Sequence, residues 1–160
     1  MGKKYDQLID KVYIHLSNQH IDTIHVTQFV RIWNISRSTL YVNFDGMEDL
    51  YLSSFEKKII VKASQNSNSL KDFIEELIKN IDQAKVFCRN CNHLNEKAFK
   101  KRIIENDIKL EIERFNLMTN SSKASVIFSL TYLITKWFEE DLKISKTEIL
   151  KELNNCLEII

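Results

Sequence analysis

The amino-acid sequence predicts an all-α fold, and three observations support this prediction. The 160-residue chain contains two glycines and no proline, the residues that most often interrupt helices. Apolar side chains recur at helical spacing along most of its length. Ser, Asp or Asn stands just before several of these amphipathic segments, where such residues cap helix N-termini. We therefore expect helices joined by short polar turns.

The first helix is expected over residues 4–18. Its apolar stripe comprises Tyr5, Leu8, Ile9, Val12, Tyr13 and Leu16. Side chains at this spacing share one face of a helix, so we expect the stripe to pack over the two short helices that follow.

A short second helix is expected from the spacing of Val26, Phe29, Val30 and Trp33, which fall at i, i+3, i+4 and i+7. Asn34 breaks this pattern, and Asn is among the few residues other than Gly that tolerate the left-handed conformation of a tight turn. The segment therefore predicts a helix of about two turns that ends in a turn at Asn34.

A third helix is expected after Ser36, a natural N-cap, with Leu40 and Phe44 facing inward. Its opposite face carries Arg37, Ser38 and Tyr41. A short helix that offers such side chains outward suits the major groove of DNA. The alternative is a pair of amphipathic helices that does not touch nucleic acid, as occurs in many helical proteins.

The string ISRSTLYVNFDGMEDL, residues 35–50, resembles the recognition helix and the following helix of the TetR family of bacterial transcriptional regulators. The matching positions are Val26, Phe29, Ile35, Ser36, Arg37, Thr39, Leu40, Tyr41, Phe44, Glu48 and Leu50. The resemblance covers about the first 55 residues. It implies a helix-turn-helix DNA-binding domain over residues 1–46 and a helical regulatory and dimerisation domain over residues 47–160.

The resemblance also implies roles for individual residues. Arg37 is expected to read a guanine and Ser38 to contact a base. The DNA-binding residues that we expect are Thr27, Ser36, Arg37, Ser38, Thr39, Tyr41 and Asn43, several of them on phosphates. The protein is expected to act as a homodimer on a near-palindromic operator in double-stranded DNA. A small-molecule effector or a partner protein would control it, and repression is the expected output.

The chain departs from the family's pattern at several places. Val30, Trp33 and Asn34 replace small residues, so the turn is bulkier than usual. Asn43 stands in place of a common His, and Met47 replaces a Lys that contacts phosphate. These departures indicate a divergent member with weaker or unusual DNA contacts.

We call the expected DNA-binding domain (residues 1–46) the headpiece and the regulatory and dimerisation domain (residues 47–160) the body. The body is expected to contain five helices. Asp45 and Glu48 form a capping signature for a helix that extends to about Gln65, and the polar run 64–69 is the expected junction between headpiece and body. Ser69 and Asp72 open the next helix. We expect a polar interruption over 88–95, helices over 96–117 and 125–142 with a separator at 120–123, and a last helix after Ser145.

The final two helices are expected to carry dimerisation, because the helix over 125–142 is apolar on more than one side. The residues assigned to the dimer interface are Leu130, Ile134, Trp137, Leu150, Leu153 and Leu157. The alternative is that these helices close the core of a single chain.

Aromatic side chains of the body are candidates for an effector pocket. They are Phe73, Phe99, Phe115, Phe128 and Tyr132. At helical spacing such residues more often belong to the core, and the short body leaves little room for a pocket.

Cys88, Cys91 and His93 form a C-x-x-C-x-H sequence that would suit metal or thiol chemistry. A structural zinc site normally needs four ligands, and this segment supplies too few. We therefore expect no metal and no cofactor. The alternative to metal or thiol chemistry is a helix end with two cysteines that have no special role.

Other composition features limit the function classes. The sequence offers neither a catalytic triad nor a glycine-rich phosphate loop, so we expect no enzyme. No apolar run approaches the length of a membrane span, and we expect a cytoplasmic protein. The net charge is +1, and residues 1–60 carry seven basic and seven acidic residues. This balance favours a rival interpretation, a helical protein-interaction adaptor whose helix-turn-helix no longer binds DNA.

Overall fold

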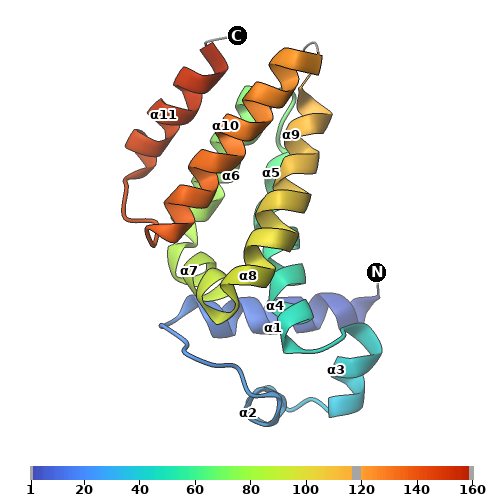
Figure 1. Ribbon diagram of the computed structural model, residues 1–160. Coiled ribbons are helices and arrows are strands. Elements are labelled where there is room, and N and C mark those ends of the chain that lie inside the picture. Colours follow the sequence, from blue (N-terminus) through green and yellow to red (C-terminus); the bar gives the residue numbers. More distant parts are fainter. Residues whose placement is uncertain (1, 117–119, 159–160) are drawn as a thin grey trace.

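The computed structural model describes residues 2–116 and 120–158, with side chains from residue 123 onward in the second range. Every regular element within these ranges is a helix, so the all-α prediction is confirmed. Figure 1 shows α1, α2 and α3 at one end of the molecule and α6, α9, α10 and α11 side by side at the other. Among the described helices, none has both the length and the apolar character needed to cross a membrane.

The three N-terminal helices lie close to their predicted positions. They are α1 (Lys3–Ser17), α2 (Val26–Ile32) and α3 (Arg37–Asn43). The predicted stripe of α1 buries Leu8, Ile9, Val12 and Leu16, and Tyr5 stacks on Phe44 with ring centroids 4.6 Å apart. The inward positions Leu40 and Phe44 are buried as expected.

A continuous helix leads from the headpiece into the body. This connecting helix consists of α4 (Met47–Phe55), the π-helical segment η1 (Glu56–Val61) and α5 (Lys62–Gln65), and it ends where the sequence predicts. The expected cap at its start is wrong. Gly46 occupies the N-cap at φ +148°, a region that favours Gly, and the Asp45 amide donates to the Asp49 carboxylate (3.0 Å).

The next helix, α6 (Leu70–Gln83), begins as predicted, because the Ser69 hydroxyl accepts the amide of Asp72 (3.1 Å). The expected interruption over 88–95 is wrong, because α7 (Lys85–Leu94) occupies it. This short helix buries Phe87, Cys88 and Cys91 together with one polar residue, Asn90. Because a polar residue occupies a buried position, the apolar spacing of this segment does not indicate a helix.

A second continuous helix follows, made of α8 (Glu96–Ala98), the π-helical η2 (Phe99–Ile108) and α9 (Lys109–Phe115). Its predicted end at Leu117 lies outside the described residues. The chain continues as α10 (Asn120–Glu139) and α11 (Lys146–Glu158). The separator expected at 120–123 is therefore wrong, because α10 already begins at Asn120.

The helix α10 ends three residues before the predicted Leu142. Asp141 and Leu142 adopt left-handed backbone conformations (φ 58° and 55°), and the Leu142 amide donates to the carbonyl of Trp137 (2.9 Å). This 6→1 hydrogen bond is characteristic of a helix C-terminus. Ser145 then accepts the amide of Glu148 (3.2 Å) and opens α11 as expected.

An aromatic cluster forms the centre of the core, where α4, α7, η2 and α10 meet. Phe55 packs against Phe87, Phe99 and Phe138, with ring centroids 5.0–6.2 Å apart. Phe55, Phe87 and Phe99 are fully buried. Because α4 continues directly from the turn after α3, this cluster anchors the headpiece to the body.

Candidate functional site

The turn between α2 and α3 accommodates the bulky residues of the sequence. Asn34 adopts the expected left-handed conformation (φ 50°), and the Ile35 amide donates to the carbonyl of Val30 (3.0 Å). Trp33 is half-buried, and its carbonyl accepts the Lys11 ammonium of α1 (3.1 Å). The large side chain is therefore placed at the edge of the core, where it does not separate the helices.

Phe29 is the buried anchor of α2, since the other side chains of this helix are exposed or half-buried. Its ring meets His15 of α1 edge to face, with centroids 5.8 Å apart. Burial lowers the pKa of His15, because the charged imidazolium is less well solvated there. The lowered pKa favours a neutral His15 beneath α2.

The start of α3 is organised by Ser36. Its hydroxyl accepts the amide of Thr39 (3.0 Å) and lies 3.0 Å from the Ser38 hydroxyl and 2.8 Å from that of Thr39. Asn43 donates to the Thr39 carbonyl (2.8 Å). Ser36 is thus engaged as the helix cap, and Asn43 uses one of its two amide hydrogens within the helix.

The solvent-facing side of α3 carries the expected Arg37, Ser38 and Tyr41, all exposed. The Nη2 of Arg37 donates to the Thr27 hydroxyl of α2 (2.7 Å), so the two short helices present their side chains together. Val42 is 84% exposed on this helix and was not among the predicted site residues. Nothing in the spacing marked it, because an apolar residue is expected to face the core.

A small groove of about 260 Å³ runs beside this face, between α1 and the start of α3. Lys4 and Lys11 of α1 line it together with Ser36 and Thr39. Sequence reasoning missed the two lysines as site residues. Their spacing of seven places them on one side of α1, but only the packing of α1 on α3 brings that side next to the start of α3.

The acidic residues of α1 are neutralised by the connecting helix. Lys57 of η1 forms an ion pair with Asp6, and Lys58 lies 2.5 Å from the carboxylate of Asp10. The hydrogen bond from Lys57 lowers the pKa of Asp6. The balanced charge of residues 1–60 therefore includes two carboxylates and two lysines that pair with each other.

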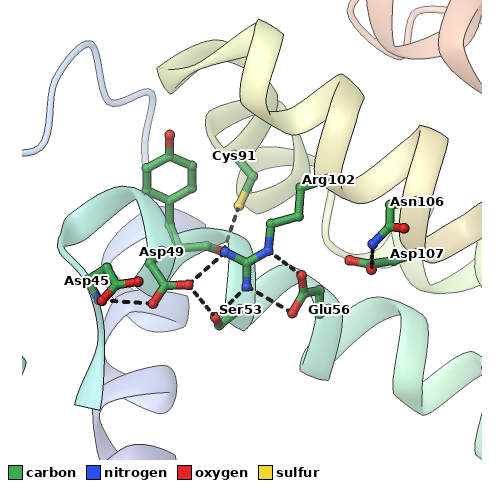
Figure 2. A network of polar contacts seen from close by, with 9 residues as sticks. Asp45, Asp49, Ser53, Glu56, Cys91, Arg102, Asn106 and Asp107 are labelled. Carbon is green, nitrogen blue, oxygen red and sulfur yellow. Dashed lines mark hydrogen bonds and ion pairs between the residues drawn. The ribbon is translucent and has the colours of Figure 1, made fainter. Parts of the chain in front are cut away.

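A polar network joins the connecting helix to η2 (Figure 2). Arg102 of η2 donates to Asp49 (2.7 Å), to Ser53 (2.8 Å) and through two nitrogens to Glu56 (2.5 and 3.1 Å). Burial opposes the charge on Arg102, but Glu56 and Asp49 outweigh it and raise its pKa further. The single Arg thus holds two turns of the connecting helix.

Asp107 lies beside this network. One carboxylate oxygen of Asp107 accepts from Asn106 (3.1 Å), and the other is buried. Burial, together with the neighbouring Glu56 carboxylate, raises the pKa of Asp107 to about 7. Sequence reasoning missed this network, because Arg102 pairs with Asp49 and Glu56, which lie 53 and 46 positions away in the chain.

The aromatic residues proposed for an effector pocket do not share one cavity. Phe73 and Phe99 are fully buried in the core, and Phe115 stacks on Phe73 at 5.4 Å. Phe128 and Tyr132 are 73% and 55% exposed and line an open groove of about 700 Å³ on α9 and α10. The predicted pocket is therefore wrong as a single site.

The predicted dimer interface is also corrected. Leu130, Ile134, Trp137 and Leu153 are fully buried within the single chain, and the Trp137 indole donates to the carbonyl of Ile144 (2.9 Å). Side chains without exposed surface cannot contact a second copy in this packing. Leu150 and Leu157 are half-buried against the same core.

Cys88 and Cys91 are fully buried, and burial raises the pKa of both thiols well above the ordinary value. The Cys91 sulfur lies 3.8 Å from the carbonyl of Tyr51. His93 is exposed and lies near His20 and Asp22 instead. The C-x-x-C-x-H sequence therefore does not form one site.

Comparison with models of known protein families finds no match, and comparison with curated proteins finds no significant similarity.

Proposed function

We propose that this protein is a TetR-like transcriptional regulator that binds double-stranded DNA through α3. The observation that carries the proposal is the exposed face of α3, with Arg37 at its first position and held by Thr27 of α2 (2.7 Å). An Arg fork matches the two acceptors of guanine in the major groove. Ser38 and Tyr41 flank it on the same exposed face.

Contacts to the DNA backbone come from residues beside α3. Lys4 and Lys11 line the groove next to Thr39, and Lys ammonium groups and hydroxyls are the usual partners of phosphate oxygens. The pairing of Asp6 and Asp10 with lysines of η1 reduces their repulsion of the phosphates. A few such contacts support binding without a basic headpiece.

The protein acts as a homodimer on a near-palindromic operator, and the exposed side of α10 is the contact between copies. Phe128 and Tyr132 stack at 6.3 Å on this side and are largely exposed. The groove beside them carries Lys109 and Glu113 from α9. Because a twofold interface pairs each patch with itself, such adjacent opposite charges are self-complementary.

Regulation acts through the connecting helix that leads from α3 into the body. Arg102 ties Asp49 and Glu56 of this helix to η2 and faces a groove of about 730 Å³. A small polar effector or a partner protein that competes for Arg102 would release the helix and change the spacing of the two headpieces. Such a regulator works in the cytoplasm, where its operator is.

The rival is an interaction adaptor that does not bind DNA. Ile32, Tyr41 and Val42 are 58%, 54% and 84% exposed on the two short helices, and exposed apolar side chains favour protein contacts. The same side chains also suit thymine methyl groups in a major groove. Their exposure alone therefore does not separate the two functions.

Salt dependence tests the proposal. Fluorescence anisotropy is measured on a pool of labelled random-sequence duplexes over a range of salt concentrations. For a DNA-binding protein, the logarithm of the association constant falls linearly with the logarithm of the salt concentration. The slope is about −0.9 for each phosphate neutralised. Lys4→Ala is expected to reduce the slope by about one, whereas Lys151→Ala, an exposed Lys of α11, leaves it unchanged. Absence of binding at the lowest salt would reject DNA binding and favour the adaptor.

A further inference from the structure

Three side chains from two segments meet at the junction of the headpiece and the body. His20 and Asp22 belong to the loop between α1 and α2, and His93 belongs to the last turn of α7. One ligand atom from each lies within 4.8 Å of the others. We propose that these residues form a binding site for a divalent transition-metal ion, with zinc as the best match.

The three groups already face one another. The Nε2 of His20 lies 2.7 Å from an Asp22 carboxylate oxygen, and the rings of His20 and His93 are 4.9 Å apart. Zinc binds imidazole nitrogen and carboxylate oxygen at about 2.0–2.2 Å, so its ligand atoms lie closer together than 4.8 Å. All three residues are exposed, and rotation of their side chains provides the required shift.

Asn90 holds the two segments in register. This buried residue of α7 donates to the carbonyls of Leu16 and Gln19 (both 2.8 Å) and accepts the amide of Ile21 (2.9 Å). The loop that carries His20 is thus attached to α7 one turn before His93. Such preorganisation reduces the ordering cost of bringing ligands together.

The ligand set determines the class of ion. Two imidazoles and one carboxylate suit zinc and neighbouring transition metals, whereas magnesium and calcium prefer oxygen ligands alone. Three protein ligands leave at least one coordination position for water. The two histidines border a cavity of about 660 Å³ that also carries Glu96 and has room for this water.

A bound ion would link the loop before α2 to α7 by coordination bonds. Zinc binding at this site is independent of DNA binding, since it is measured on the protein alone. The buried thiols Cys88 and Cys91 take no part in it.

Isothermal titration with zinc chloride tests the site on the full chain. The wild type is expected to bind one ion, and His20→Ala and His93→Ala to weaken binding by at least about tenfold. His25→Ala, which removes an exposed His of the same loop, is the matched control and leaves the affinity unchanged. Because these side chains are exposed, circular dichroism of each variant should match that of the wild type.

Cobalt(II) provides a second readout. Its visible spectrum is expected to show bound nitrogen and oxygen ligands and to be lost in His93→Ala. A thiolate charge-transfer band would assign the ion to a cysteine and overturn the proposal. The proposal also fails if the wild type binds no zinc, or if both histidine variants bind it as tightly as the wild type.

Discussion

Arg37 and Thr27 are joined across the turn between α2 and α3, where the Arg37 guanidinium donates to the Thr27 hydroxyl (2.7 Å). Both residues are exposed, so the hydrogen bond orients the Arg at the surface. A side chain that is held before binding loses less freedom when it meets its target. The pair therefore links α2 to the orientation of Arg37, the side chain that we propose reads DNA.

Replacing Thr27 tests this connection. Thr27→Val removes the acceptor and nearly preserves the shape, and we expect DNA affinity to fall by about fivefold, or about 1 kcal/mol, a typical value for one hydrogen bond. Stability to urea should stay within about 0.5 kcal/mol, because the residue is exposed. Anisotropy titration measures the affinity. An unchanged affinity would show that Arg37 does not depend on Thr27.

The exposed aromatic pair of α10 tests the proposed dimer. The double change Phe128→Ser and Tyr132→Ser should convert dimers to monomers, because it removes the apolar centre of the contact. Sedimentation equilibrium measures the mass. Ile14→Ser, which changes an exposed apolar residue of α1, is the control and should remain dimeric. A dimer that persists in the double variant would place the interface elsewhere.

Arg102 should contribute measurably to stability. Arg102→Ala leaves Asp49 and Glu56 without their cation, and we expect a loss of about 1–3 kcal/mol, reduced from the value for a fully buried pair because the groups are partly exposed. Urea unfolding measures it. Lys101→Ala, at the neighbouring exposed position, should change the free energy of unfolding by less than about 0.5 kcal/mol. Equal effects of the two changes would contradict the account of the network.

The raised pKa of Asp107 leads us to expect that the free energy of unfolding depends on pH. Its pKa is raised to about 7 in the folded protein, from an ordinary value of 3.8, so the folded state binds the proton more tightly. Protonation of Asp107 therefore stabilises the folded protein. This contribution is complete below pH 3.8 and is lost as the pH rises through about 7. A pKa raised from 3.8 to about 7 corresponds to about 4 kcal/mol, which screening at this half-exposed site reduces to about 1–2 kcal/mol.

The variant Asp107→Asn mimics the protonated acid and should remove this loss. Urea unfolding from pH 5 to pH 8 is expected to show a declining free energy of unfolding for the wild type and a flatter profile for the variant. At pH 8 the variant should be the more stable protein. Parallel profiles would show that another group titrates.

Local signals in the sequence predicted much of the fold. The caps at Ser36, Ser69 and Ser145 and the left-handed turn at Asn34 depend on residues close in the chain, and the structure contains each of them. The helix α7 was missed because Asn90 is buried and satisfied by Leu16, Gln19 and Ile21, which are distant in sequence. Periodicity counts such a residue as surface.

The candidate sites were less predictable, because they depend on which faces meet. The sequence identified the outward face of α3 from its own periodicity. It did not separate the buried Trp137 from the exposed Phe128 on α10, since an all-round apolar helix does not indicate which side the chain itself covers. His20 and His93 meet only through the contact of the loop with α7.

Selection from fragments of genomic DNA is the decisive test of whether α3 reads a DNA sequence. Purified wild type, Arg37→Ala and Lys151→Ala are each incubated with the fragments at moderate salt, and the bound DNA is sequenced. Lys151→Ala is the control because it also removes one positive charge, but from α11. We expect wild type and Lys151→Ala to enrich the same near-palindromic site, and Arg37→Ala to lose this preference. Equal enrichment by all three proteins, or none by the wild type, would show that Arg37 of α3 does not read a DNA sequence.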